Sequence, residues 1–186
     1  MPRPLIAVAV TLVVAAAAVG GVLLDRRDGV DARTADLVAA EEARTVEDAA
    51  AVTATAQDVV DVLSPMAESL AGPSPAAADV ATWTADVAAL QDRLAAEPGG
   101  STAANAARSA LRSTVALTGS SLEAHALAAD APEDALAVRL GAHAADLGDQ
   151  ALRSWVTAAT LVDVANVDAG LGHVHLTLAP GVGVDH

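Results

Sequence analysis

The feature that most constrains this chain is an uninterrupted apolar run near its start, residues 5–24, which begins at Leu5 and ends at Leu24. It contains no charged side chain, and Thr11 carries its one hydroxyl. An α-helix rises about 1.5 Å per residue, so a helix of this length spans the roughly 30 Å hydrocarbon layer of a lipid bilayer. The run therefore predicts a transmembrane helix, and residues 1–24 are expected to form a membrane anchor.

The same run has a second interpretation, a signal peptide that is removed during export. Ala16, Ala17 and Ala18 offer the small residues that cleavage requires, but a cut there leaves the apolar residues 22–24 at the new N-terminus. The run is also longer than the roughly 7–15 apolar residues that a signal peptide needs. We therefore favour an uncleaved signal anchor, with a product secreted after cleavage as the alternative.

The charges on the two sides of the run favour opposite orientations in the membrane. Arg3 favours a cytoplasmic N-terminus, whereas Arg26, Arg27 and Arg33 favour the opposite orientation by the positive-inside rule. A basic leader before an apolar run is also typical of an export signal. We expect a single-pass protein of the cell membrane with its domain outside the cytoplasm, and a cytoplasmic domain is the alternative.

Composition excludes several classes of function. The net charge is -14, with 24 acidic residues against 10 basic ones, so the surface repels nucleic acid and anionic headgroups. Cysteine is absent, which excludes disulfides, thiolate metal sites and a cysteine nucleophile. The alanine-rich sequence lacks Phe and Tyr, a pattern typical of high-G+C bacterial genomes. A core of Ala, Val and Leu buries little area per residue, so modest stability is expected.

Turn-forming residues divide the rest of the chain into four segments with helical periodicity. The first helix is expected to follow a juxtamembrane linker, residues 25–33, that turns at Asp28 and Gly29. It should run to about Leu63 and stop at Ser64-Pro65, because the residue before a proline is pushed out of the helical region, with one more turn over residues 66–72 as the alternative. The other expected boundaries are Pro73-Ser74-Pro75, the turn from Glu97 to Gly100, the turn from Asp130 to Glu133, and Gly170.

Apolar residues at helical spacing predict the face that each helix buries. The second helix has the strictest seam, with coiled-coil spacing: Val80, Trp83, Val87, Leu90 and Leu94. The first is expected to bury Val46, Ala50, Thr53, Ala56, Val60 and Leu63, and the third Ala104, Ala107, Leu111, Val115 and Leu122. The fourth is expected to bury Leu136, Leu140, His143, Leu147, Ala151, Ser154, Ala158 and Leu161, with Leu152, Trp155, Ala159 and Val162 beside them.

The short turns between the later helices require antiparallel neighbours. The expected fold is therefore all-α: the N-terminal transmembrane helix, an antiparallel four-helix bundle over residues 34–169, and a C-terminal tail over residues 170–186 that is strand-like or disordered. This architecture resembles the ligand-binding bundles of bacterial membrane receptors, although the sequence shows neither a second span nor a signalling module. A shared architecture does not transfer function.

Three residues are candidates for lining a pocket inside the bundle: Trp83, His143 and Trp155. The simpler interpretation, which we favour, is that the two tryptophans fill an alanine-rich core and that His143 has an ordinary hydrogen-bond partner. His125 on the third helix could assist His143, but antiparallel pairing places it more than a helical turn away. The sequence therefore predicts no cofactor.

The tail alternates apolar and polar residues between Gly172 and Leu178, which is a strand pattern. His173 and His175 would share one side of a strand, and His186 could supply a third zinc or copper ligand. These histidines are the candidate metal residues, against the simpler interpretation of a tail that packs on the bundle or trails from it. Unpaired strand edges also predict pairing with a second copy or with a partner's sheet.

No catalytic pattern is present. The sequence lacks the Glu-x-x-His motif of carboxylate-bridged metal bundles, a Gly-x-Ser-x-Gly motif and a glycine-rich phosphate loop. We expect a non-enzymatic interaction or scaffold module, tethered to the bilayer, with an unknown protein partner and at most weak self-association. The alternatives are a small-ligand sensor and, after it, a metal-binding or hydrolytic protein.

Overall fold

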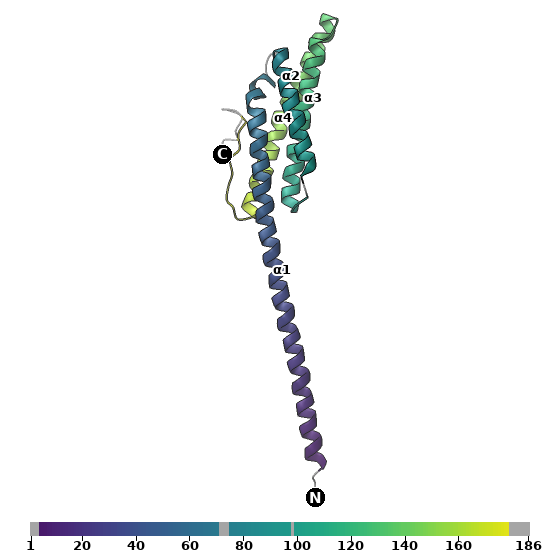
Figure 1. The fold of residues 1–186 in the computed structure, drawn as a ribbon, viewed down its shortest axis with the longest axis vertical. Helices are drawn as coiled ribbons and strands as arrows, with labels where there is room; N and C mark the ends of the chain where they lie inside the picture. Colours follow the sequence, from purple (N-terminus) through teal and green to yellow (C-terminus); the bar gives the residue numbers. More distant parts are fainter. Residues whose placement is uncertain (1–3, 71–74, 98, 179–186) are drawn as a thin grey trace. The chain divides into compact units, whose positions relative to one another are not determined.

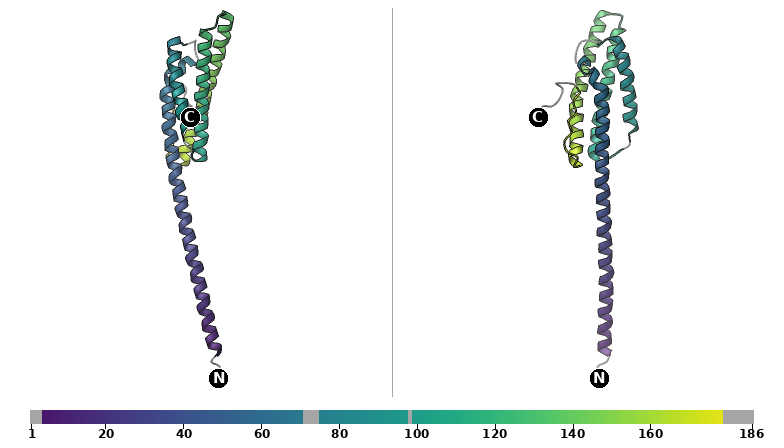
Figure 2. Two further views of the ribbon diagram at one scale, coloured as in Figure 1. Left: turned by 45° about the vertical axis from the view of Figure 1, so that its right-hand side comes forward. Right: turned by 60° about the vertical axis from the view of Figure 1, so that its left-hand side comes forward.

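The computed structural model describes the backbone of residues 4–70, 75–97 and 99–178, and the side chains of the same ranges from residue 33 onward. The described chain forms four helices and no β-strand: α1 (Pro4–Leu70), α2 (Ala77–Ala96), α3 (Thr102–Ala129) and α4 (Asp134–Asp168) (Figure 1). It divides into two compact units, Met1–Ala43 and Arg44–His186. In the second unit, the four helices lie side by side as a bundle (Figure 2). The prediction of an all-helical bundle is confirmed.

The predicted anchor, residues 5–24, and its contact with lipid lie outside the residues whose side chains are described. Within the part of the chain that is described, no helix combines the length and the apolar character needed to cross a membrane. The anchor therefore stays a prediction from the sequence.

Helix α1 continues through both places where the sequence predicted an interruption, the turn at Asp28 and Gly29 and the end at Pro65. Both of these predictions were wrong. Beyond Pro65 the helix buries Met66 and Leu70 in the bundle core. Burial of a large apolar side chain stabilises by about 1.5–3 kcal/mol, so two of them offset the roughly 3 kcal/mol that a proline inside a helix costs.

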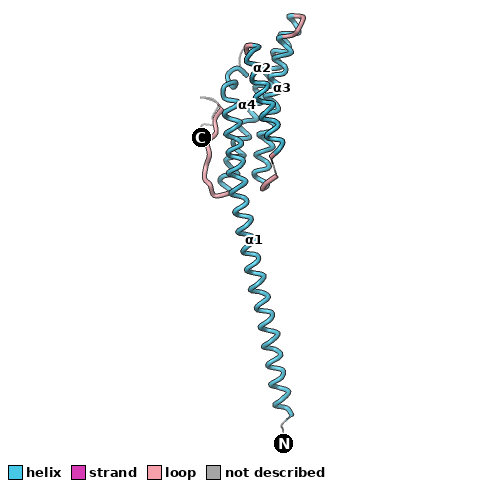
Figure 3. The backbone as a smooth tube through the Cα atoms, in the orientation of Figure 1, coloured by secondary structure: helices cyan, strands magenta, loops and turns pink. Residues whose placement is uncertain are grey.

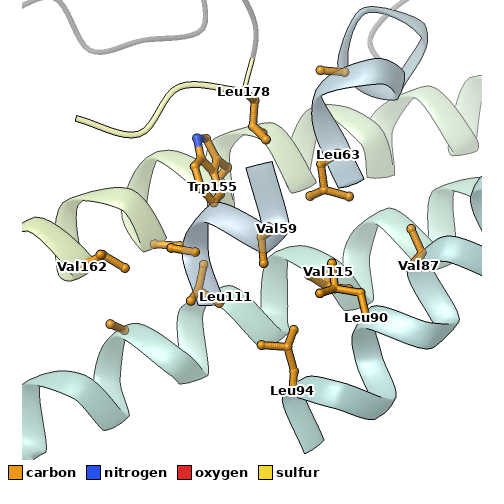
Figure 4. Close-up of a cluster of buried hydrophobic side chains, with 14 of the residues drawn as sticks. Val59, Leu63, Val87, Leu90, Leu94, Leu111, Val115, Trp155, Val162 and Leu178 are labelled. Atoms are coloured by element: carbon orange, nitrogen blue, oxygen red, sulfur yellow. The ribbon is translucent and has the colours of Figure 1, made fainter. Parts of the chain in front are cut away.

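Each helix of the bundle buries one seam of residues spaced three and four apart (Figure 4). The seam of α2 is as predicted, with Trp83 half-buried, and so is the seam of α3. The seam predicted for α1 was largely wrong, because only Ala56 and Leu63 of the expected residues are fully buried. The observed seam of α1 is Ala49, Val52, Ala56, Val59, Leu63, Met66 and Leu70.

The buried seam of α4 was predicted in part: Ala151, Trp155, Ala158 and Val162 are buried as expected, whereas Leu136, Leu140, His143, Leu147, Ser154 and Leu161 are not fully buried. The observed seam consists of Ala144, Gly148, Ala151, Trp155, Ala158 and Val162. Gly148 approaches the end of α1 so closely that an added Cβ would overlap the carbonyl oxygen of Leu70. Small residues therefore face the bundle, and the larger Leu140 and Leu147 are only half-buried. The misplaced Leu140 and Leu147 were chosen for their size, whereas the contact at Gly148 requires a small residue.

The turn between α2 and α3 is joined to α1 by polar contacts. Arg108 Nε lies 3.2 Å from Glu97 Oε2, and Thr55 of α1 donates a hydrogen bond of 2.5 Å to Glu97 Oε1. Asp48, also on α1, accepts a hydrogen bond of 2.5 Å from the backbone N–H of Ser101. These contacts hold the α2–α3 turn against α1 at one end of the bundle.

Candidate functional site

The candidate site is a cavity of about 760 Å³ at the end of the bundle opposite the α2–α3 turn. It exists because the helices differ in length: α2 has 20 residues and α3 has 28, and α3 and α4 extend past the start of α2 (Figures 1 and 2). Its wall includes Val80, Ala81 and Thr84 of α2, His125, Ala126 and Ala129 of α3, and Ala137, Val138 and Gly141 of α4. Most of these side chains are small and apolar, so they leave space and do not compete for hydrogen bonds.

His125 is the distinctive group of this wall. Its side chain is only 5% exposed, and neither Nδ1 nor Nε2 has a hydrogen-bond partner. Burial lowers the pKa of His125 from its ordinary value of 6.5, because a charged imidazolium is disfavoured away from water. The ring is therefore neutral at pH 7 and carries one donor nitrogen and one acceptor nitrogen, both unused.

The polar residues that precede His125 on the same face of α3 are all satisfied. Thr118 donates a hydrogen bond of 3.1 Å to the carbonyl of Thr114, and Ser121 donates one of 2.8 Å to the carbonyl of Ala144 on α4. Thr114 in turn lies 3.0 Å from the hydroxyl of Ser154 on α4. A buried polar group without a partner costs about 1–3 kcal/mol, and in this row of four residues only His125 bears that cost.

The predicted pocket residues do not meet around a cavity. Trp155 is 1% exposed and fills the core, which agrees with the simpler interpretation. Trp83 is half-buried against the same core, and His143 is exposed, so its expected place on the buried stripe was wrong. None of the three lines this cavity or the second one described below.

The tail after α4 packs on the bundle as an extended loop (Figure 3). Val174 and Leu176 lie against the core, and Leu178 is buried in the same cluster as Trp155 and Leu63 (Figure 4). The period-two alternation is thus present, but the prediction of a strand was wrong for the described residues. The backbone runs along helices, which offer no edge for ladder hydrogen bonds.

A second, smaller cavity of about 390 Å³ lies between α4 and this tail. At its wall, His173 Nδ1 lies 3.0 Å from Asp163 Oδ2, and the backbone N–H of Val174 donates a hydrogen bond of 2.8 Å to Asp163 Oδ1. These contacts, led by the His173 hydrogen bond, lower the pKa of the Asp163 carboxyl. The rings of His173 and His175 are stacked with centroids 6.5 Å apart.

The described side chains contain no group of three residues placed to hold a metal ion. His173 and His175 are exposed neighbours, but the described chain brings no third ligand to them. His186, the third candidate, lies outside the described residues. The Asp163–His173 contact therefore explains how the tail is held, and the metal site has no support beyond the sequence pattern.

Replacing His125 by leucine is expected to raise the free energy of unfolding by about 1–3 kcal/mol at neutral pH, because an unpartnered polar ring gives way to an apolar side chain. The variant should also lose a pH dependence. In the wild type the unfolded chain binds the His125 proton more readily, so stability is fully present above pH 6.5 and falls as the pH drops toward the lowered pKa of the folded chain. Urea unfolding at about pH 7.5 and about pH 5.5 measures both effects.

The matched control for that experiment is His143→Leu, since His143 is exposed on α4 and should change neither value. A loss of stability in His125→Leu at neutral pH would mean that the ring has a structural partner, which would remove the reason for treating it as a site.

His125 was considered from the sequence only as an assistant to His143. The signal that could have found it is the polar row Thr114, Thr118, Ser121 and His125, which repeats at four, three and four residues along a buried face. A search of protein family models, curated proteins and solved structures finds no match to this chain.

Proposed function

We propose that this chain is a membrane-tethered, non-enzymatic binding module that takes up a small, mainly apolar molecule in the cavity beside His125. The supporting observation is the cavity of about 760 Å³ with an unpartnered imidazole in its wall. Small-molecule sites are typically mostly apolar clefts of about 300–1,000 Å³ with a few polar groups that orient the ligand. A buried histidine with a purely structural role normally has a hydrogen-bond partner.

The tether in this proposal is the apolar run of residues 5–24, supported by its length and its lack of charge. We place the bundle outside the cytoplasm in a single-pass arrangement. Protease treatment of intact cells tests the side, and N-terminal sequencing tests the anchor. A mature chain that begins after Ala18 would replace the anchor by a cleaved signal peptide.

A protein partner is the second candidate. It is favoured by Leu127, which is 54% exposed, and Val138, which is 71% exposed, near the turn that joins α3 and α4. Of these, Val138 also belongs to the wall of the cavity, which joins it to further apolar residues and to one buried, unpartnered imidazole. We therefore rank a small ligand above a protein partner, which reverses the order expected from the sequence.

The test uses the neutral fluorescent probe N-phenyl-1-naphthylamine on the full chain held in amphipol. The wild type should bind the probe and unfold at a higher temperature, gaining about 1.4 kcal/mol at ten times the dissociation constant. Ala137→Leu puts a larger side chain into the cavity wall and should abolish the bound fraction. Ala135→Leu, an exposed position on the same helix outside the wall, is the matched control and should bind normally.

Probe dissolved in amphipol contributes equally to the fluorescence of both variants. The difference between their fluorescence signals therefore measures binding to the cavity. Equal binding by Ala137→Leu and Ala135→Leu would place the probe elsewhere, and no binding by the wild type would overturn the proposed function.

A further inference from the structure

We infer that the cavity selects an uncharged ligand that carries a hydroxyl group on an apolar body, with the hydroxyl bound by His125. This inference rests on the proposed function and specifies the chemistry of the ligand. It starts from the two ring nitrogens of His125, which have no hydrogen-bond partner among the described protein groups.

A hydroxyl can hydrogen-bond to either tautomer of the neutral ring. Neutral imidazole has one donor and one acceptor, and which nitrogen carries the proton depends on the partner. A hydroxyl both donates and accepts, so it can bond to whichever nitrogen it meets. The terminal torsion of a histidine side chain has a broad energy minimum, so the ring of this wall residue can adjust its orientation to a ligand at low cost.

The charges around the cavity disfavour ionised ligands. Asp130, at the end of α3, is the one other titratable residue in the wall, and the wall residues of α2 and α4 are uncharged. An anion would therefore meet a carboxylate and no cation. Burial lowers the pKa of His125, so a positive charge is disfavoured at this position. A charged group bound at His125 would lose its hydration without compensation.

The apolar body of the ligand would lie along Val80 and Ala81 on one side and Ala137 and Val138 on the other. Thr84 can offer the ligand only an acceptor, because its own hydroxyl already donates a hydrogen bond of 2.7 Å to the carbonyl of Val80. His125 is thus the side chain of the wall that offers both a donor and an acceptor.

Three probes of the same shape test this inference: p-cresol, p-xylene and p-toluate. They place a hydroxyl, a methyl and a carboxylate on one tolyl ring. Binding to the full chain in amphipol is followed by the ¹⁵N chemical shifts of the His125 ring in histidine-labelled protein. We expect p-cresol to bind about ten-fold more tightly than p-xylene, as one net hydrogen bond implies, and p-toluate not to bind.

The ¹⁵N shifts of His125 should change with p-cresol and not with p-xylene. His125→Leu should remove the preference for p-cresol while p-xylene still binds. Binding of p-cresol to the wild type should also weaken as the pH falls below 6.5, because a protonated ring has no acceptor nitrogen and is disfavoured in the cavity.

The outcomes distinguish the hydroxyl assignment from the proposed binding function. Equal affinity for p-cresol and p-xylene, or an unchanged preference in His125→Leu, would overturn the hydroxyl assignment and leave the cavity as a site for apolar molecules. Preferential binding of p-toluate would overturn the exclusion of anions. If none of the three probes binds, the proposed function fails together with this inference.

Discussion

Replacing Trp155 by alanine is expected to lower the free energy of unfolding by about 3–5 kcal/mol, the range for truncating a large buried aromatic side chain. Trp155 is 1% exposed and is the largest fully buried side chain among the described residues. Its neighbours in the core are mostly alanine, valine and leucine, and the chain contains no Phe or Tyr. Small neighbours cannot move far enough to fill the space of an indole, so most of the cavity would remain.

The chain provides its own control in Trp83, which is half-buried against the same core. Trp83→Ala should cost clearly less, because part of the indole is already in contact with water. Urea unfolding followed by far-ultraviolet circular dichroism measures both variants, and each keeps one tryptophan as a fluorescent reporter. Equal losses in the two variants would contradict the placement of Trp155 at the centre of the bundle.

Gly148→Ala is expected to lower the free energy of unfolding by about 3 kcal/mol, the upper end for overpacking. The new Cβ would overlap the backbone carbonyl of Leu70, and backbone cannot move aside as the end of a flexible side chain can. Alanine is intrinsically favoured over glycine inside a helix by about 1 kcal/mol, so the sign of the effect is informative. A lower free energy of unfolding means that the clash with α1 outweighs the gain in helix propensity.

Gly99→Ala is the control, since a Cβ at Gly99 would meet no heavy atom within 4 Å and its φ is not in the left-handed region. It should leave the stability unchanged or raise it slightly. The melting temperatures of the two variants give the comparison. If Gly148→Ala were the more stable of the two, α4 and the end of α1 could not be in contact at Leu70.

The seams of α2 and α3 could be predicted because large apolar residues and buried faces coincide there. Leu90 and Leu111 recur at helical spacing between clear turns, and the structure buries both. Part of the seam of α4 was missed for a different physical reason. Where two helices approach closely, as at Gly148, the interface selects small residues, and hydrophobicity no longer marks the buried face.

Other features depend on contacts between parts of the chain far apart in sequence. Pro65 ends a helix on local grounds, but the burial of Leu70 against α4 carries the helix through it. The alternation in the tail was recognised, yet the sequence could not show that helices rather than a sheet would cover Val174 and Leu178. His125 owes its buried position to the unequal lengths of α2 and α3 and to α4, so no local pattern around it could predict the cavity.

The first turn of α2 forms part of the cavity wall and has no side-chain cap. Ala76 precedes this turn and offers no side-chain acceptor to its free amides, and such an acceptor stabilises a helix start by about 1 kcal/mol. Uncapped helix ends fray, and motions of this kind take nanoseconds to microseconds. Ala77, Val80 and Ala81 belong to this end of α2 and also form the wall beside His125. The same missing cap therefore leaves one wall of the cavity on the least stabilised turn of α2, so a substitution of Ala76 by Ser or Asp would stiffen that wall without touching the residues that line it.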